Sequence, residues 1–206
     1  MLIQKIEKLK NSPVKKTIGK RMKEFEEIGK GTNEQIFSEL CFCIMTANFN
    51  AKKAIEIQNK MRKAFCILPE KELAEKLKEH GHRFPNTRAK HISKSQKHSK
   101  TIKQDLKNFK DGKKLRNWLA DNITGLGMKE ASHFLRNIGY KNVAIIDFHI
   151  IDLLEREKMI ERPKTITKRK YEEIEKVLEN LGKKVKLSLA ELDLYLWFME
   201  TGTVLK

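Results

Sequence analysis

The feature that most constrains the fold is a helical spacing of apolar residues along nearly the whole chain, which only four prolines interrupt. Apolar residues recur every three or four positions from Phe37 to Ile44, and again from Tyr171 to Leu181. This spacing places them on one face of a helix rather than on one face of a strand. A chain of 206 residues is also long enough to bury a sizeable core. The sequence therefore predicts an all-α protein.

Capping signals mark where some of these helices begin. Thr32 and Gln35 form a capping box before the first stripe, and Ser188 and Glu191 form one before the last helix. Gly182 is expected to end the helix that carries the second stripe. Other helices are expected over residues 13–29, 51–65, 69–79, 87–106 and 113–122.

The charge of the chain indicates a polyanionic partner. Forty-four Lys and Arg against 27 Asp and Glu give a net charge of +17, in a chain that is 39% hydrophobic and so expected to fold. Residues 83–116 hold twelve Lys or Arg and two acids, hence +10 of that charge. This segment predicts either a solvated helix face or a surface that docks on phosphates. We expect a nucleic acid rather than a membrane, because no basic stretch has a large apolar face.

The three cysteines favour a reducing compartment. Their number is odd, and no signal peptide or apolar run of transmembrane length is present, so we expect a cytoplasmic protein. Cys41 and Cys43 stand two apart on a helix, where side chains point to different faces. They are therefore expected in the core rather than in a metal site.

The most informative segment is residues 123–139, which predicts two helices joined by a tight turn. Gly125 and Gly127 lie in the turn, where glycine permits positive φ and a close approach of the backbone to a partner. The second helix is expected to begin near Met128, with its first amides free to bind a phosphate. The Gly-Leu-Gly turn also fits an ordinary interhelical connection.

Lys129 falls in the first turn of that second helix. The helix dipole disfavours a positive charge there, which would help an amine to act as a nucleophile. A surface lysine without a special role fits the same position.

Eighteen residues later, Asp147 follows an apolar run and precedes an amphipathic helix. This pattern predicts an N-cap, and a fixed carboxylate could also stabilise a developing cation. His149 would lie in the first turn, either against a phosphate or covering the surface.

These motifs resemble the helix-hairpin-helix DNA glycosylase superfamily, whose mark is a G-x-G-x-K hairpin followed by an aspartate about eighteen residues later. Within it the chain resembles the archaeal-type 8-oxoguanine DNA glycosylase/AP lyase family, the second class of such enzymes. The additional motifs are L-C-F-C-I-M-T-A-N-F at 40–49, G-H-R-F at 81–84, and L-D-L-Y-L-W with T-G-x-V-L-K at 192–206. The resemblance implies two lobes with the active site in the cleft between them.

The resemblance also implies a reaction. Lys129 matches the nucleophile, which displaces the oxidised base and forms a Schiff base that permits β-elimination. Asp147 matches the catalytic carboxylate. The implied substrate is double-stranded DNA containing 8-oxoguanine, with no cofactor. The alternatives are action on a different oxidised base, or a noncatalytic helix-hairpin-helix module that binds DNA.

Further residues match positions of the family that contact DNA or the base. Asn48 matches a side chain that fills the gap left by the extruded nucleotide. Phe84 and Trp197 match aromatic residues that stack near the base, and Lys206 matches a C-terminal lysine whose region recognises the lesion. Without the resemblance, Asn48 would be a helix residue with a satisfied amide, the two aromatics would be core residues and Lys206 a frayed terminus.

His133 could tune Lys129 from one turn further along, and His149 matches a phosphate contact. The turn glycines Gly125 and Gly127 belong to the DNA-binding hairpin. Backbone carbonyls of Asp121, Ile123 and Leu126 could hold a monovalent cation, although no metal is required.

Two positions depart from the pattern of the family. Phe148 stands where archaeal-type relatives often have a basic residue, and Thr124 replaces a proline common in the hairpin. These changes affect a phosphate contact and the stiffness of the turn rather than the chemistry. We expect one lobe of roughly 113–160, with the hairpin over 113–139, and the remaining helices in the other lobe. We expect the boundary between the two lobes to lie within 108–122. We also expect a monomer that is associated with the nucleoid.

Overall fold

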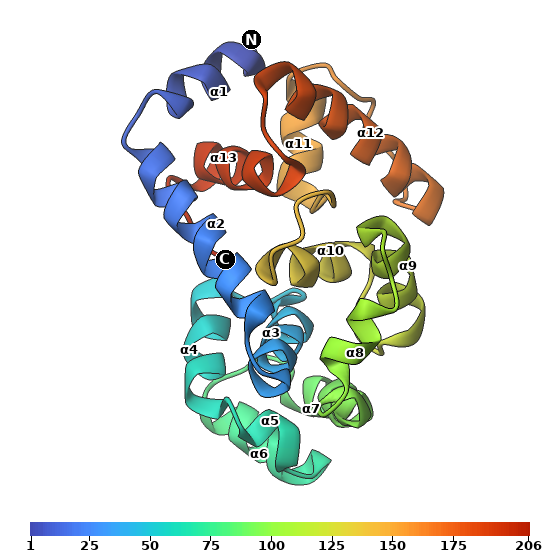
Figure 1. Ribbon diagram of the computed structural model, residues 1–206. Helices are drawn as coiled ribbons and strands as arrows, with labels where there is room; N and C mark the ends of the chain where they lie inside the picture. Colours follow the sequence, from blue (N-terminus) through green and yellow to red (C-terminus); the bar gives the residue numbers. More distant parts are fainter.

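The computed structural model describes all 206 residues as helices joined by turns and irregular segments, with no strand (Figure 1). The all-α prediction is confirmed. None of the helices has both the length and the apolar composition needed to cross a bilayer. The α-helices, with one 3₁₀ turn (η1), are α1 (Leu2–Lys10), α2 (Val14–Lys30), α3 (Asn33–Thr46), α4 (Ala51–Met61), α5 (Ala64–Ile67), α6 (Glu70–Glu79), α7 (Pro85–Ser95), η1 (Gln96–His98), α8 (Ile102–Lys107), α9 (Gly112–Asn122), α10 (Met128–Asn137), α11 (Phe148–Arg156), α12 (Lys168–Val185) and α13 (Leu189–Thr201).

Helix α3 forms the centre of the first core. Every residue from Ile36 to Thr46 is buried, because the sequence is apolar around most of the helix and not only along one stripe. The predicted capping box fixes its start, since the Thr32 side chain accepts from the Gln35 amide at 3.3 Å and Gln35 Oε1 accepts from the Thr32 amide at 2.8 Å. Apolar side chains from α4 to α10 pack around α3, and both cysteines of this helix lie in that core as expected.

A second core lies in the other half of the molecule. Helices α1, α11, α12 and α13 bury their apolar faces against one another there, and a smaller cluster joins α2 to α13. Helix α1 was not among the expected helices, although Leu2 and Ile6 have helical spacing and are buried in this core. Figure 1 shows the two halves above and below α10.

The boundary between the two large cores falls between Val143 and Ala144. The hairpin of α9 and α10 packs into the first core, whereas Asp147 follows a segment that packs into the second. Residues 113–160 therefore contribute to both cores, and the lobe expected over roughly this range stays a prediction. Val143–Ile146, an irregular buried segment, passes between the cores.

The prediction of one long helix over 87–106 is wrong. Three elements occupy this segment: α7, η1 and α8. The interruption has a tertiary cause, because the Gln96 side chain donates to the carbonyls of Phe65 at 3.0 Å and Leu68 at 2.7 Å. Similarly, the expected helix over 51–65 ends at Met61, and the short helix α5 follows.

Gly182 does not end its helix, which is a further correction. Helix α12 continues to Val185, and Lys186 adopts the left-handed conformation that closes it, with φ of 53°. The Leu187 amide donates back to the Gly182 carbonyl at 2.9 Å. A Cβ at position 182 would lie 2.8 Å from the Leu187 carbonyl oxygen, so glycine is needed here for close approach.

Candidate active site

The hairpin turn has the predicted glycine conformation at only one of its two glycines. Gly125 has φ of +92°, and a Cβ there would lie 2.4 Å from Nδ1 of His91 on α7. Gly127 is extended instead and acts as the N-cap of α10, where its amide donates to Glu130 Oε2 at 3.3 Å. The turn is therefore held from both sides, by α7 and by the first turn of α10.

Lys129 is the second residue of α10, as predicted. Its side chain is 25% exposed, and Nζ lies 3.8 Å from Glu130 Oε1, which is a loose ion pair. The helix start fixes its backbone, while no close ion pair holds the amine. The amine can therefore reach a substrate.

Asp147 is the N-cap of α11, which confirms the pattern-based prediction. Its Oδ1 accepts from the Ile150 amide at 3.0 Å. This bond fixes the orientation of the carboxylate. Because Oδ2 accepts no protein hydrogen bond, it stays available to a ligand.

A largely buried aspartate on α13, Asp193, is influenced by both groups. Its pKa is raised to about 6: burial is the main cause and the Asp147 carboxylate adds to it, whereas the positive charges of Arg136 and Lys129 oppose the rise. Arg136 Nη1 lies 3.4 Å from Asp193 Oδ2. Lys129 and Asp147 thus come from different cores and act on one carboxyl group. The sequence analysis missed Asp193, and the only signal was a single acid within the apolar run of α13.

Lys206 is anchored rather than frayed. Its Nζ donates to Glu39 Oε1 at 2.7 Å and also to Gln58, and it lies 4.5 Å from the centroid of the Phe42 ring. Glu39 is buried on α3 and also accepts from Asn137 at 3.1 Å. The carboxylate of Glu39, which sequence analysis missed, therefore fixes the C-terminal segment against the first core.

His133 is buried near both Lys129 and Lys206. Burial together with the charges of Arg136 and Lys129 holds the pKa of His133 well below its ordinary value, so the ring is neutral at pH 7. Its ring packs edge-on against Phe42 with centroids 5.6 Å apart, and neither ring nitrogen has a well-formed hydrogen bond.

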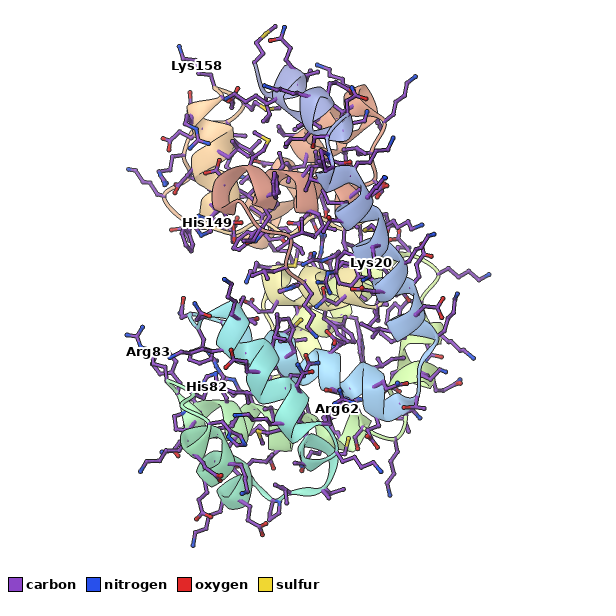
Figure 2. All side chains as sticks on the ribbon, turned by 90° about the vertical axis from the view of Figure 1, so that its left-hand side faces the viewer. Lys20, Arg62, His82, Arg83, His149 and Lys158 are labelled. Atoms are coloured by element: carbon purple, nitrogen blue, oxygen red, sulfur yellow. The ribbon has the colours of Figure 1, made fainter.

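The other residues predicted to contact the base or the DNA backbone lie in both halves of the molecule. Trp197 packs edge-on against His149 at 5.3 Å between centroids, and Phe148, which is 65% exposed, stacks on the same imidazole at 4.0 Å. Figure 2 shows His149 in the upper half and Arg83 in the lower half, both on the same side of the molecule. Phe84 starts α7, with the guanidinium of Arg83 4.9 Å from its ring centroid.

Asn48 does not lie in a helix, which excludes that alternative. It is exposed in the turn between α3 and α4 and has a φ of +56°. Asparagine is one of the few residues besides glycine that tolerates this conformation.

Of the hairpin carbonyls predicted to hold a cation, one already accepts a hydrogen bond within the turn. The Ile123 carbonyl accepts from the Leu126 amide at 3.1 Å. A monovalent cation at Asp121, Ile123 and Leu126 stays a prediction.

The basic segment 83–116 is not wholly a surface. Arg88 is buried and donates to the Ala47 carbonyl at 2.5 Å, and Arg116 is fully buried against Glu175 at 2.6 Å. Most of its lysines are exposed, among them Lys90 and Lys94. Those exposed charges are the part of the segment that can meet phosphates.

The sequence matches the family model of 8-oxoguanine DNA glycosylase over residues 18–187. It is 51% identical over 207 residues to the 8-oxoguanine DNA glycosylase/AP lyase of Methanocaldococcus jannaschii, with 100% of each chain covered. This chain belongs to the 8-oxoguanine DNA glycosylase family. A further family member, from Korarchaeum cryptofilum, is 45% identical over 100% of this chain and 98% of its own.

Solved structures of the 8-oxoguanine DNA glycosylase family have the same fold. The M. jannaschii glycosylase/lyase in complex with a 15mer DNA containing 8-oxoguanine matches with a TM-score of 0.97 and 50% identity, over 100% of each chain. The Thermotoga maritima enzyme matches with a TM-score of 0.93 and 39% identity, over 100% of this chain and 98% of that chain. The family resemblance and the helix-hairpin-helix glycosylase fold are thus confirmed.

Proposed function

We propose that this member of the 8-oxoguanine DNA glycosylase family excises 8-oxoguanine from duplex DNA and then cleaves the abasic strand, with Lys129 as nucleophile and Asp147 as the assisting carboxylate. The observation that carries the proposal is the arrangement of these two side chains. Each starts a helix of a different core, and both are near enough to Asp193 to change its pKa.

The proposed chemistry assigns the nucleophilic attack to Lys129 and the stabilisation of the sugar charge to Asp147. The unprotonated amine of Lys129 attacks C1′, and the C1′–N9 bond breaks with its electron pair leaving on the base, which takes up a proton. Asp147 Oδ2 stabilises the positive charge on the sugar during this step. As the ring opens, a proton passes from the amine to O4′, which leaves a protonated imine between C1′ and Nζ. Loss of a C2′ proton then expels the 3′-phosphate, and water hydrolyses the imine.

The extruded base would be held by aromatic residues and by the anchored C-terminal segment. Trp197 and Phe84 would stack on the base from opposite halves of the molecule. Lys206 would recognise the lesion from the position that Glu39 fixes. Asn48, exposed at a turn, would fill the gap left in the duplex.

Two further contacts would position the DNA backbone. The hairpin turn at Gly125 and Gly127 and the imidazole of His149 would each meet a phosphate. Since one chain supplies every proposed contact, we expect a monomer to be active. We also expect it to work on nucleoid DNA.

Borohydride trapping tests the role of Lys129. With a duplex that carries one 8-oxoguanine, the wild-type protein should form a reduced covalent adduct. Lys129→Gln should form none, lose base release and strand cleavage, and still bind the lesion duplex. Lys141→Gln, a lysine whose partner Glu26 lies on α2 away from these groups, is the matched control and should form the adduct normally.

An adduct formed by Lys129→Gln at the wild-type rate would refute the assignment of Lys129. Parallel assays on thymine glycol and abasic duplexes define the substrate range. Faster excision of thymine glycol than of 8-oxoguanine would overturn the proposed lesion.

A further inference from the structure

A buried hydroxyl on α12 lies between the segments that carry Lys129 and Asp147. Tyr171 is 2% exposed. Its hydroxyl donates to the Ala144 carbonyl at 2.7 Å and accepts from the Ile146 amide at 3.2 Å. The hydroxyl of Ser132 on α10 is also 3.2 Å away.

The phenol oxygen is both a donor and an acceptor in these bonds. It has one proton, and two acceptors lie within reach of that proton: the Ala144 carbonyl at 2.7 Å and the Ser132 hydroxyl oxygen at 3.2 Å. The Ile146 amide can only donate, so it binds a lone pair of the same oxygen.

These partners are the sequence neighbours of the two proposed catalytic groups. Ser132 follows Lys129 by three residues on the same helix, which is about one turn. Ile146 directly precedes Asp147. A single oxygen atom thus connects the helix of the amine to the segment of the carboxylate.

The segment before Asp147 depends on α12 for its hydrogen bonds. Residues Val143–Ile146 are buried and belong to no helix or strand, yet buried backbone groups need partners. The Ala144 amide donates to Glu175 Oε1 at 2.8 Å, and Tyr171 serves the Ala144 carbonyl and the Ile146 amide. Glu175 is in turn fixed by Arg116 of α9.

We propose that Tyr171 is a positioning residue, whose hydroxyl sets the distance between the Lys129 amine and the Asp147 carboxylate across the boundary of the two cores. This inference rests on the roles proposed above for Lys129 and Asp147. Tyr171 itself is buried and does not touch the substrate. Its contribution is to geometry, and a misplacement of about 1 Å can cost about a hundredfold in rate.

Single-turnover kinetics of Tyr171→Phe test the inference. The variant keeps the ring, including its contact with the Arg116 guanidinium 5.3 Å from the ring centroid, and loses only the hydroxyl. The rate constant for base excision should fall about tenfold to a hundredfold, while Kd for the lesion duplex stays within twofold. A destabilised variant would lose reaction amplitude rather than rate constant, so the two effects separate. Tyr195→Phe, another buried tyrosine, is the matched control and should keep the wild-type rate constant.

Ser132→Ala provides an independent test should Tyr171→Phe fold poorly. It removes the α10 end of the link and should slow excision by a similar factor. The double variant should be no slower than the slower single variant, because both remove one connection. A rate constant within twofold of wild type for either single variant, or multiplicative losses in the double variant, would overturn the inference. If these variants are fully active while Lys129→Gln forms no adduct, the proposed function stands and only the role of Tyr171 is lost.

Discussion

At the residue scale, the site depends on charges that are held out of water. Asp193 is 11% exposed at its side chain and shares its surroundings with Arg136, Lys129 and Asp147. Two carboxylates and two cations therefore lie in one region with little solvent. Burial opposes ionisation of Asp193 more strongly than the two cations favour it, and the pKa rises.

This raised pKa makes stability depend on pH in a defined direction. The carboxyl changes from an ordinary value of 3.8 to about 6 on folding, so the native state binds more protons than the unfolded state between these values. Stability from Asp193 is present at pH 4 and lost as pH rises through about 6, by at most about 3 kcal/mol. Urea unfolding of wild type and Asp193→Asn from pH 4 to pH 7 should show the unfolding free energy of the wild type falling relative to that of the variant over this window. A constant difference would contradict the assignment.

At the element scale, the hairpin is the part that the sequence predicts best. The spacing of Gly125, Gly127 and Lys129 places a turn and a helix start correctly because both features are local. The conformation of each glycine, however, depends on contacts that the local sequence does not reveal. Gly125 needs positive φ and lies against His91 from another helix, whereas Gly127 is extended. Sequence alone could not separate the two.

Alanine substitutions should distinguish a constrained glycine from a tolerant one. Gly125→Ala should destabilise the protein by about 1–3 kcal/mol, because φ of +92° and the contact with His91 both exclude a Cβ. It should also weaken binding to undamaged duplex DNA. Gly19→Ala on the exposed face of α2, where no atom lies within 4 Å, should instead stabilise by about 0.5–1 kcal/mol. Thermal melting measures both, and an unchanged Tm for Gly125→Ala would refute the strain argument.

At the scale of the whole molecule, sequence predicts the fold class and the family but not how the cores divide. Asp147 was identified from its local pattern, whereas Asp193, Glu39 and Tyr171 were not. Each of these three acts through a partner far away along the chain, such as Ala144 for Tyr171 or Lys206 for Glu39. Such pairings arise only when parts of the chain that are distant in sequence pack together. The prediction of one long helix over 87–106 is wrong for the same reason, because Gln96 binds the carbonyls of Phe65 and Leu68.

The net charge of +17 predicts strong salt dependence of DNA binding. Binding to undamaged duplex should fall linearly on a plot of log K against log salt. Removing two exposed charges of the basic segment, Lys90→Gln with Lys94→Gln, should make the slope shallower by about 2. Lys15→Gln with Lys16→Gln removes the same charge from α2 and should leave the slope unchanged. Equal slopes for all three proteins would show that segment 83–116 is only a solvated face.

The contact between His91 and the hairpin turn limits how far this motif could be transplanted into another scaffold. A graft of residues 112–137 would include both hairpin helices but leave the imidazole that packs on Gly125 behind. The isolated turn would lose its covering ring and expose the buried faces of Leu119 and Leu126. An engineered DNA-binding chimera would therefore need α7 as well as the hairpin.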